Sequence, residues 1–265
     1  MRIACQTYSW EMQLQQRPTT LWQMFDAIAA AEYTGVEFTT VTGAAWLGDP
    51  IRVKAELDAR GLALAAVAVA RNGFTDPMGL GEDLTLTEQV IALLKHFPGT
   101  LLQFGGAAHP DSANWQPHLD AAIRYYHEAG VLAATAGIAC AVHPHSHHGS
   151  LLETREQYDY LFDKLPGTVG WCPDTGHILR GGQELLPTLD RYAGRIAYMH
   201  LKSVDDAGVW QPLGKGRVDL PALIGWLRAH GYTGWLVAEE ESAGAWTDPN
   251  IAITQNAYVM KEALQ

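Results

Sequence analysis

Four residues with metal-binding side chains each stand at or just after the end of a short apolar run in the sequence. Two imidazoles and two carboxylates of this kind suit Zn²⁺, Mn²⁺ or Co²⁺. A single histidine in such a place is commonly a hydrogen-bonded structural residue, but four residues on consecutive strands are hard to explain as caps. We therefore predict one bound divalent metal ion, with Glu240 as the rival of Glu239 because a one-residue register shift would exchange them. The four predicted ligands are His143, Asp174, His200 and Glu239.

Further polar residues near these four could take part in the chemistry. A metal that chelates a ketone and an adjacent hydroxyl acts as a Lewis acid and stabilises an enolate. A base must then remove the α-proton, and the candidates are His145, His177 and Glu239, since imidazole titrates near neutral pH and a carboxylate beside a metal can also serve. Lys202, two residues after His200, points to the same side of an extended strand, where it is predicted to hold a substrate oxygen or carboxylate.

Several of these residues also have a structural alternative. Glu37 is predicted to bind substrate hydroxyls, or else to form a salt bridge at the mouth of the fold. Arg217 either binds substrate or a phosphate, or is a solvated side chain. His145 acts in the site or fixes a metal ligand through a hydrogen bond. His177 contacts substrate or is simply a neighbour of a helix N-cap.

The elements that must position these residues alternate along the chain. Short apolar runs indicate strands, and the longer stretches between them have helical spacing of apolar residues. About eight strand-then-helix units result, the number that closes a (β/α)₈ barrel (TIM barrel), in which the carboxyl ends of the strands meet at one mouth. A doubly wound open sheet is the alternative, but no Gly-x-Gly-x-x-Gly follows an early strand. The predicted strands are 3–5, 35–38, 62–70, 101–104, 138–142, 169–172, 196–199 and 235–238, and the predicted helices are 21–29, 53–60, 84–97, 117–136, 154–165, 185–192, 221–230 and 251–263.

Length and composition favour a single domain. The chain has 265 residues, 48% of them hydrophobic, which suits one large core of the usual barrel size. No linker-like segment interrupts it, so we predict one domain over residues 1–265. The three cysteines, Cys5, Cys140 and Cys172, lie far apart in apolar runs and are predicted to be buried thiols.

Charge and hydropathy exclude other classes of protein. The 18 basic and 29 acidic residues give a net charge of −11, and without a basic run the chain is not expected to bind nucleic acid. The apolar runs are too short to span a membrane, which needs about 18 apolar residues. The N-terminal segment indicates a first strand and lacks the apolar region of a signal peptide. We therefore expect a cytoplasmic protein.

The motifs at the strand ends resemble those of the sugar phosphate isomerase/epimerase superfamily, the xylose isomerase-like barrels. The resemblance spans essentially the whole chain and is strongest over 140–241. It implies the barrel fold, a bound divalent metal and a small sugar or inositol as substrate. The segments that carry it are 35–37, 141–145, 173–177, 199–202, 214–219 and 235–239.

The branch of the superfamily that the chain most resembles is that of the inosose dehydratases. Isomerases and epimerases of this fold generally have a glutamate where His143 stands, and they use it with the glutamate at the last strand as an acid/base pair. Because only Glu239 remains of that pair, we predict a metal-dependent lyase that dehydrates a keto-inositol or keto-sugar. A ketose isomerase or epimerase is the alternative.

Two further possibilities are disfavoured. An apurinic-site nuclease shares this fold but needs a cluster of zinc ions and a positive surface, which the net charge of −11 opposes. A non-catalytic barrel would not need four intact ligands. The sequence leaves open the exact substrate, the metal and the oligomeric state, a homo-oligomer included.

Overall fold

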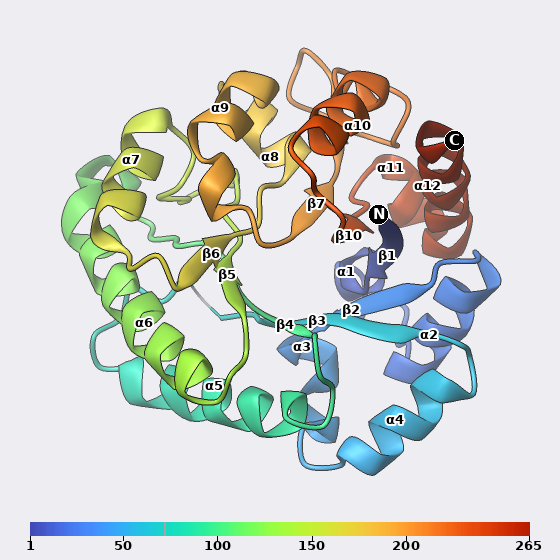
Figure 1. Cartoon of the computed structure of the whole chain (residues 1–265), viewed down its shortest axis with the longest axis horizontal. Helices are drawn as coiled ribbons and strands as arrows, with labels where there is room; N and C mark the ends of the chain where they lie inside the picture. The colour runs from blue at the N-terminus through green and yellow to red at the C-terminus, as the bar shows by residue number, and fades with distance from the viewer. Residues whose placement is uncertain (72) are drawn as a thin grey trace. The chain divides into compact units, whose positions relative to one another are not determined.

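Strands alternate with helices along the chain. The computed structural model describes residues 1–71 and 73–265 (Figure 1). Contacts within the chain divide it into two compact units. Unit 1 comprises Met1–Ala66 and Met199–Gln265, and unit 2 comprises Val67–Tyr198. The prediction of a single domain stays a prediction.

The sheet of unit 1 places four parallel strands side by side in the order β2, β1, β10, β7. Nearly all of their side chains are buried, as expected for parallel strands covered on both faces. A separate antiparallel pair, β8 with β9, follows β7 in the chain. The strands are β1 (Arg2–Gln6), β2 (Gly35–Thr39), β7 (Met199–Leu201), β8 (Ser203–Val204), β9 (Trp210–Gln211) and β10 (Trp235–Ala238).

Most helices of unit 1 follow a residue whose side chain caps them. Thr20 forms a capping box with Gln23 at the start of α2, which buries Leu21, Phe25 and Ile28 along one face. The C-terminal helix α12 lies beside β1, close to the N-terminus (Figure 1). The helices are α1 (Tyr8–Glu11), α2 (Leu21–Ala30), α3 (Thr40–Gly43), η1 (Ala44–Trp46), α4 (Pro50–Asp58), α10 (Leu220–Ala229), α11 (Ala243–Thr247) and α12 (Pro249–Leu264).

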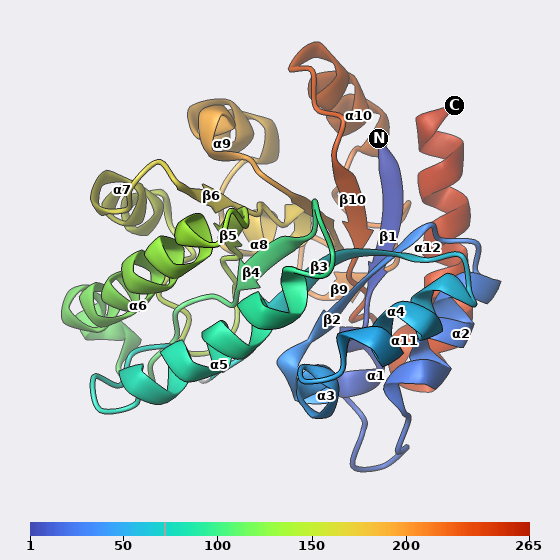
Figure 2. The ribbon, with the colours of Figure 1, turned by 60° about the horizontal axis from the view of Figure 1, so that its bottom comes forward.

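Unit 2 contains three parallel strands in the order β4, β5, β6. Helices α5 and α6 pack side by side (Figure 2). Strand β3 (Ala63–Val69) contributes residues 63–66 to unit 1 and 67–69 to unit 2. The other elements are α5 (Leu80–Leu94), β4 (Leu101–Phe104), η2 (Ser112–Asn114), α6 (Trp115–Thr135), β5 (Cys140–Val142), α7 (Arg155–Lys164), β6 (Val169–Trp171), α8 (Thr175–Arg180), α9 (Leu185–Arg191) and η3 (Ala193–Arg195).

Strand β7 differs from the sequence prediction. The apolar run 196–199 predicted a strand, whereas β7 spans Met199–Leu201. Residues Ala193–Arg195 form the 3₁₀ turn η3, and Ile196 makes an isolated bridge to Trp171, so the strand begins later in the sequence. His200 therefore lies inside the strand and not after its end, so the prediction of its position was wrong by two residues.

The short helices α1, α3, α8 and α11 are not predicted from the sequence. Each has four to six residues, too few turns to show a helical repeat of apolar side chains. Helix α5 also begins at Leu80 and ends at Leu94, where the sequence predicted 84–97. Helix α8 matters most for the site, because it begins directly after Asp174.

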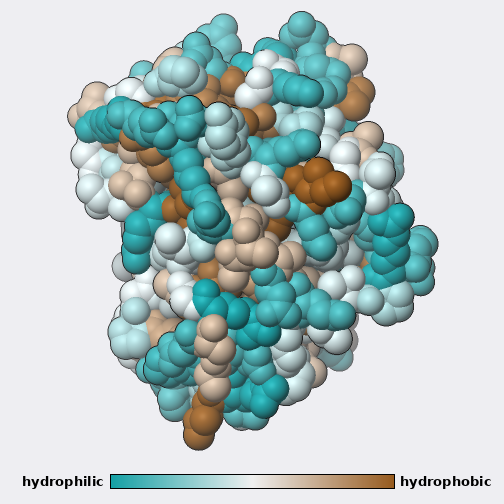
Figure 3. Space-filling view, turned by 90° about the vertical axis from the view of Figure 1, so that its right-hand side faces the viewer, coloured by the Kyte–Doolittle hydropathy of each residue, from teal (hydrophilic) through white to brown (hydrophobic). Residues whose placement is uncertain are grey.

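The surface drawn in Figure 3 is mainly hydrophilic, and its hydrophobic side chains form small separate groups. Scattered groups of this kind are ordinary for a protein surface. In residues 1–71 and 73–265, none of the helices combines the length and the apolar character needed to cross a bilayer. The three cysteines are buried and free of disulfides, as predicted.

Candidate functional site

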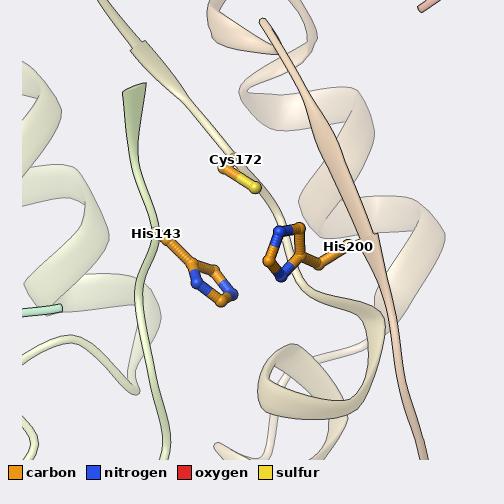
Figure 4. A group of neighbouring side chains, drawn as sticks. All are labelled: His143, Cys172 and His200. Atoms are coloured by element: carbon orange, nitrogen blue, oxygen red, sulfur yellow. The ribbon is translucent and has the colours of Figure 1, made fainter. Parts of the chain in front are cut away.

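Unit 1 gathers five charged or ionisable side chains from within its strands or just after them, which we call the carboxylate cluster. His200 projects from β7 (Figure 4), and Glu239 directly follows β10, the neighbouring strand. The Nδ1 atom of His200 lies 2.8 Å from Oε2 of Glu239, and Nε2 lies 2.9 Å from Oε2 of Glu37. One imidazole therefore stands between two carboxylates. The members of the cluster are Glu37, His200, Lys202, Glu239 and Glu241.

Lys202 is buried within this cluster. Its Nζ donates to Oε1 of Glu239 at 2.6 Å and also donates to Glu241. The ammonium lies 4.9 Å from the ring centroid of Trp210, close enough for a cation–π contact. Lys202 and His200 thus contact the same carboxylate, that of Glu239. The predicted role of Lys202 in holding substrate stays a prediction.

The electrostatics of the cluster are unusual for a protein interior. Three carboxyl groups share one ammonium group and one imidazole, and such buried charge needs balancing partners. Burial raises the pKa of Glu241; the ammonium of Lys202 opposes this rise in pKa, and the charge of Glu239 adds to it. Burial, together with the charge of Glu241, raises the pKa of Tyr8 to about 12. A cation would be stabilised in these surroundings.

Glu240, the rival of Glu239, points elsewhere. Its Oε1 accepts from the backbone N–H of Ser242 at 2.7 Å, and its Oε2 accepts from Nδ2 of Asn256 on α12 at 2.6 Å. Glu239 instead faces His200 and the ammonium group beyond it. The register of β10 thus gives the two glutamates different surroundings.

Arg217 lies outside the carboxylate cluster. Its Nε is 3.3 Å from Oδ1 of Asp206, and 42% of the side chain is exposed. The backbone N–H of Arg217 donates to the carbonyl of Val204 at 2.8 Å, an approach that Gly216 permits with a φ of +87°. Its predicted role in binding substrate stays a prediction.

Unit 2 gathers a second group, which we call the histidine cluster: His143, His145, Asp174 and His177. His143 directly follows β5, and Figure 4 shows it with Cys172, which directly follows β6. Oδ1 of Asp174 caps α8 by accepting from the backbone N–H of His177 at 2.8 Å. Oδ2 of Asp174 lies 3.6 Å from Nε2 of His143. This buried oxygen has no hydrogen-bond partner among the described residues.

The three histidines of this cluster lie close together. One ring nitrogen from each of His143, His145 and His177 lies within 4.8 Å of the others. The Nε2 atom of His145 is 3.2 Å from Nδ1 of His143. Gly106 allows its own segment to lie close to the backbone of His145, because a Cβ at Gly106 would lie 2.9 Å from the backbone nitrogen of His145.

The surroundings of His177 fix its tautomer. The backbone N–H of Ser146 donates to Nδ1 of His177 at 2.9 Å, and the Ser146 hydroxyl lies 2.8 Å from the same atom. A backbone N–H can only donate, so the neutral ring carries its proton on Nε2. Arg180 also holds this residue, by donating to the carbonyl of Ser146 at 2.9 Å. The ring is therefore arranged as a hydrogen-bond donor, which argues against its predicted use as a base.

Several residues of the two clusters were missed in the sequence. Gln6 and Glu241 contact members of the carboxylate cluster, and Ser146 and Arg180 contact or support His177. Glu241 stands two residues after Glu239, a spacing that could have suggested it. The other three gave no signal, because glutamine, serine and arginine are common at strand and loop ends.

Both clusters suit a divalent metal ion by their chemistry. Imidazole nitrogens and carboxylate oxygens are its usual ligands, and both clusters contain the two types. The buried Oδ2 of Asp174 and the surplus of carboxyl groups around Lys202 are features that a bound cation would satisfy.

Comparison with known proteins identifies the family of the chain. Residues 25–263 match the family described as xylose isomerase-like TIM barrel. The chain belongs to this family. The predicted (β/α)₈ barrel is thereby confirmed as the fold class, and the prediction that the chain is an enzyme is confirmed at the level of the family.

Relatives of this xylose isomerase-like barrel include two curated proteins. Inosose dehydratase from Geobacillus kaustophilus (strain HTA426) is 26% identical over 264 residues, covering 86% of this chain and 82% of that protein. Inosose dehydratase from Geobacillus thermodenitrificans (strain NG80-2) is 31% identical, but the match spans 49% of this chain and 50% of that protein. These matches confirm the predicted resemblance to this branch.

A solved structure supports the same fold. The IOLI protein, whose crystal structure contains a binding zinc atom, aligns with a TM-score of 0.81 over 100% of this chain and 98% of its own. The two sequences are 15% identical, so the likeness shows the fold alone. This xylose isomerase-like barrel is thus a TIM barrel enzyme related to proteins named inosose dehydratase.

Proposed function

We propose that this chain is a divalent-metal-dependent dehydratase acting on a keto-inositol or keto-sugar. The observation that carries the proposal is Glu239, which directly follows β10 and contacts both His200 and Lys202 through its two oxygens. Glu239 is thus both a proposed metal ligand and a possible base. Its carboxylate also contacts a second proposed ligand, His200, and the buried ammonium of Lys202. The proposed ligands are His143, Asp174, His200 and Glu239.

The family supports this ligand set. In TIM barrels the carboxyl ends of the strands form the mouth at which active sites lie, and each proposed ligand lies at or near such an end. The ion, Zn²⁺, Mn²⁺ or Co²⁺, would supply Lewis-acid stabilisation of charge on the ketone oxygen. The zinc in the IOLI crystal structure supports a metal in this fold.

The chain's own residues divide the remaining work. Dehydration breaks a C–H bond beside the ketone and a C–O bond one carbon further on, forms a C=C bond and releases water. Glu239 is the proposed base for the proton, with His145 as the alternative. Lys202 and the Nε2–H of His177 are the proposed donors that hold substrate oxygens. The ammonium of Lys202 is also the proposed acid that protonates the leaving hydroxide to give water.

The choice of dehydration over isomerisation follows from position 143. An isomerase of two-base type needs a second carboxylate opposite Glu239, and His143 cannot supply its charge. The two relatives named inosose dehydratase support the same choice. A small-molecule substrate, a cytoplasmic location and possible homo-oligomers remain our predictions.

The test is a screen of the purified protein against keto-inositols and ketoses, with Mn²⁺, Zn²⁺ or Co²⁺ added after chelation. We expect the absorbance of an enone to grow with at least one keto-inositol or keto-sugar when metal is present. The chelated protein is the matched control and should be inactive. Interconversion of a ketose with its epimer, without dehydration of any compound, would overturn the proposal in favour of an epimerase.

A further inference from the structure

Glu37 has both carboxylate oxygens engaged by the protein. Its Oε1 accepts from Nε2 of Gln6 at 2.7 Å, and its Oε2 lies 2.9 Å from Nε2 of His200. The side chain has no exposed surface. A residue that binds substrate hydroxyls needs an oxygen that the substrate can reach, and Glu37 offers none.

The place of Glu37 in the sheet explains this burial. Glu37 is the middle residue of β2, and Gln6 is its register partner at the end of β1. The carbonyl of Glu37 also accepts from the backbone N–H of Thr7 at 3.0 Å. Glu239, in contrast, lies one residue beyond its strand. Of the two carboxylates that flank His200, Glu37 is therefore the one built into the sheet.

We infer that Glu37 is a positioning residue that fixes the His200 ring, so that Nε2 keeps its proton and Nδ1 binds the metal. The inference rests on the metal site of the proposed function. An ionised carboxylate can only accept, so the hydrogen bond to Glu37 needs a proton on Nε2. Nδ1 faces Oε2 of Glu239, also a carboxylate oxygen, at 2.8 Å, and a metal ion bound at Nδ1 would take the place of the proton between these two atoms. The neutral ring would then keep its proton on Nε2, opposite Glu37.

Gln6 completes this arrangement from the far side. Its amide N–H₂ donates to the other oxygen of Glu37 and so limits rotation of the carboxylate. A metal-bound histidine commonly donates its second ring N–H to a carboxylate, which orients the ring and makes it a stronger ligand. Gln6, Glu37 and His200 form such a chain, running from the sheet to the proposed ligand atom.

The first experiment measures the affinity of the Glu37→Gln variant for Zn²⁺ by competition with a chromophoric chelator. An amide has one oxygen for two donors and no charge, so we expect zinc affinity to fall about 10–100-fold. At saturating zinc, KM for the substrate should stay close to that of the wild type. Unchanged zinc affinity with a raised KM would show that Glu37 binds substrate and would overturn the inference.

A matched control comes from Glu11, a half-buried glutamate of unit 1. Its carboxylate accepts hydroxyl hydrogen bonds from three threonines and does not contact His200. Glu11→Gln should therefore bind zinc as the wild type does. An equal loss in both variants would show a general effect of removing buried charge, which also contradicts a specific role for Glu37.

The second experiment leaves Glu37 unchanged. Long-range ¹H–¹⁵N NMR of the zinc-loaded wild type should find the His200 proton on Nε2, with the signal assigned by its absence from His200→Gln. A proton on Nδ1, or zinc binding without His200, would overturn the inference. The zinc affinities and the NMR signal are measured without substrate, so a failure to dehydrate any substrate would refute the proposed function and leave this inference standing.

Discussion

The two clusters organise similar side chains in different ways. In the carboxylate cluster, charged groups bind one another, as Lys202 and Glu239 do at 2.6 Å. In the histidine cluster, backbone groups set the side chains: Ser146 N–H fixes His177, and the start of α8 engages Asp174. The first arrangement depends on a balance of charge, and the second depends on the direction of hydrogen bonds.

This difference predicts different responses to substitution. Removing a charge from the carboxylate cluster leaves a buried partner unpaired, which is costly because buried charges need compensation. Changing a side chain in the histidine cluster alters which atom donates and which accepts, while its backbone partners remain. Neutral replacements should therefore do more damage in the carboxylate cluster than in the histidine cluster.

The largest effect is expected for Glu239→Gln. This change removes a proposed ligand charge and a proposed base, and it leaves Lys202 with one charged carboxylate fewer. We expect the dehydration rate to fall at least about 10²–10⁴-fold, the usual contribution of a general base, together with loss of metal. Glu240→Gln is the control and should keep its metal, because Glu240 contacts Ser242 and Asn256 instead. Metal loss from Glu240→Gln alone would assign the site to the other glutamate.

A second test converts the proposed lyase toward its alternative. His143→Glu restores the carboxylate that isomerases of this fold carry, and it keeps a side chain able to bind metal. We expect metal to be retained, elimination to slow by a factor of about 10²–10⁴ if proton transfer is misdirected, and slow exchange of a substrate proton with solvent to appear. Mass spectrometry in heavy water measures that exchange. Faster dehydration in this variant would contradict our interpretation of His143.

The histidine cluster is tested at His177. Glutamine places an N–H₂ group where the ring has Nε2–H, so His177→Gln should retain most of the rate. His177→Ala removes the donor and should lose about 10²-fold, the lower range for a donor that stabilises developing charge. The ratio of the two kcat values is the measurement. If both variants are equally impaired, His177 acts as a base and the tautomer fixed by Ser146 is not the active one.

The smallest effect concerns stability and pH at Glu11. Burial raises the pKa of Glu11 above its ordinary value of 4.5, and hydrogen bonds from the hydroxyls of Thr7, Thr39 and Thr42 oppose the rise. The folded state therefore holds this proton more tightly than the unfolded state. The resulting stability is complete below about pH 4.5 and is lost as pH rises through the folded pKa.

Glu11→Gln should remove this loss, so Tm of the variant relative to wild type should increase between pH 4 and pH 7. Differential scanning fluorimetry across that range measures it. Glu32→Gln is the control with the opposite sign, because Lys261 lowers the pKa of the exposed Glu32. Its effect should be small, as for other surface ion pairs. A relative Tm of Glu11→Gln that falls with rising pH would contradict the assignment.

Strand-end residues were predictable because of their place in the sequence. His143 and Glu239 each follow an apolar run, and the runs do form β5 and β10. Asp174 was predicted at a strand end and is found three residues beyond the last residue of β6, where it caps the helix α8. The alternation of buried strands with amphipathic helices was enough to predict the barrel.

Partners that depend on tertiary structure were not predictable. Glu37 and His200 are 163 residues apart in the chain, and only the sheet brings them together. The tautomer of His177 depends on a backbone N–H, which every residue except proline possesses, so the sequence cannot indicate it. The later start of β7 depends on the turn η3, whose three residues have no distinctive composition.

The central claim is the proposed ligand set of one metal ion: His143, Asp174, His200 and Glu239. Its most direct test is metal content, measured by mass spectrometry after reconstitution with Zn²⁺ and gel filtration. The wild type should hold one ion per chain, and His143→Ala, Asp174→Ala, His200→Ala and Glu239→Ala should each lose most of it while remaining folded. Full zinc content in both His143→Ala and Asp174→Ala, or in both His200→Ala and Glu239→Ala, would contradict the claim, because the ligands of one cluster would then suffice.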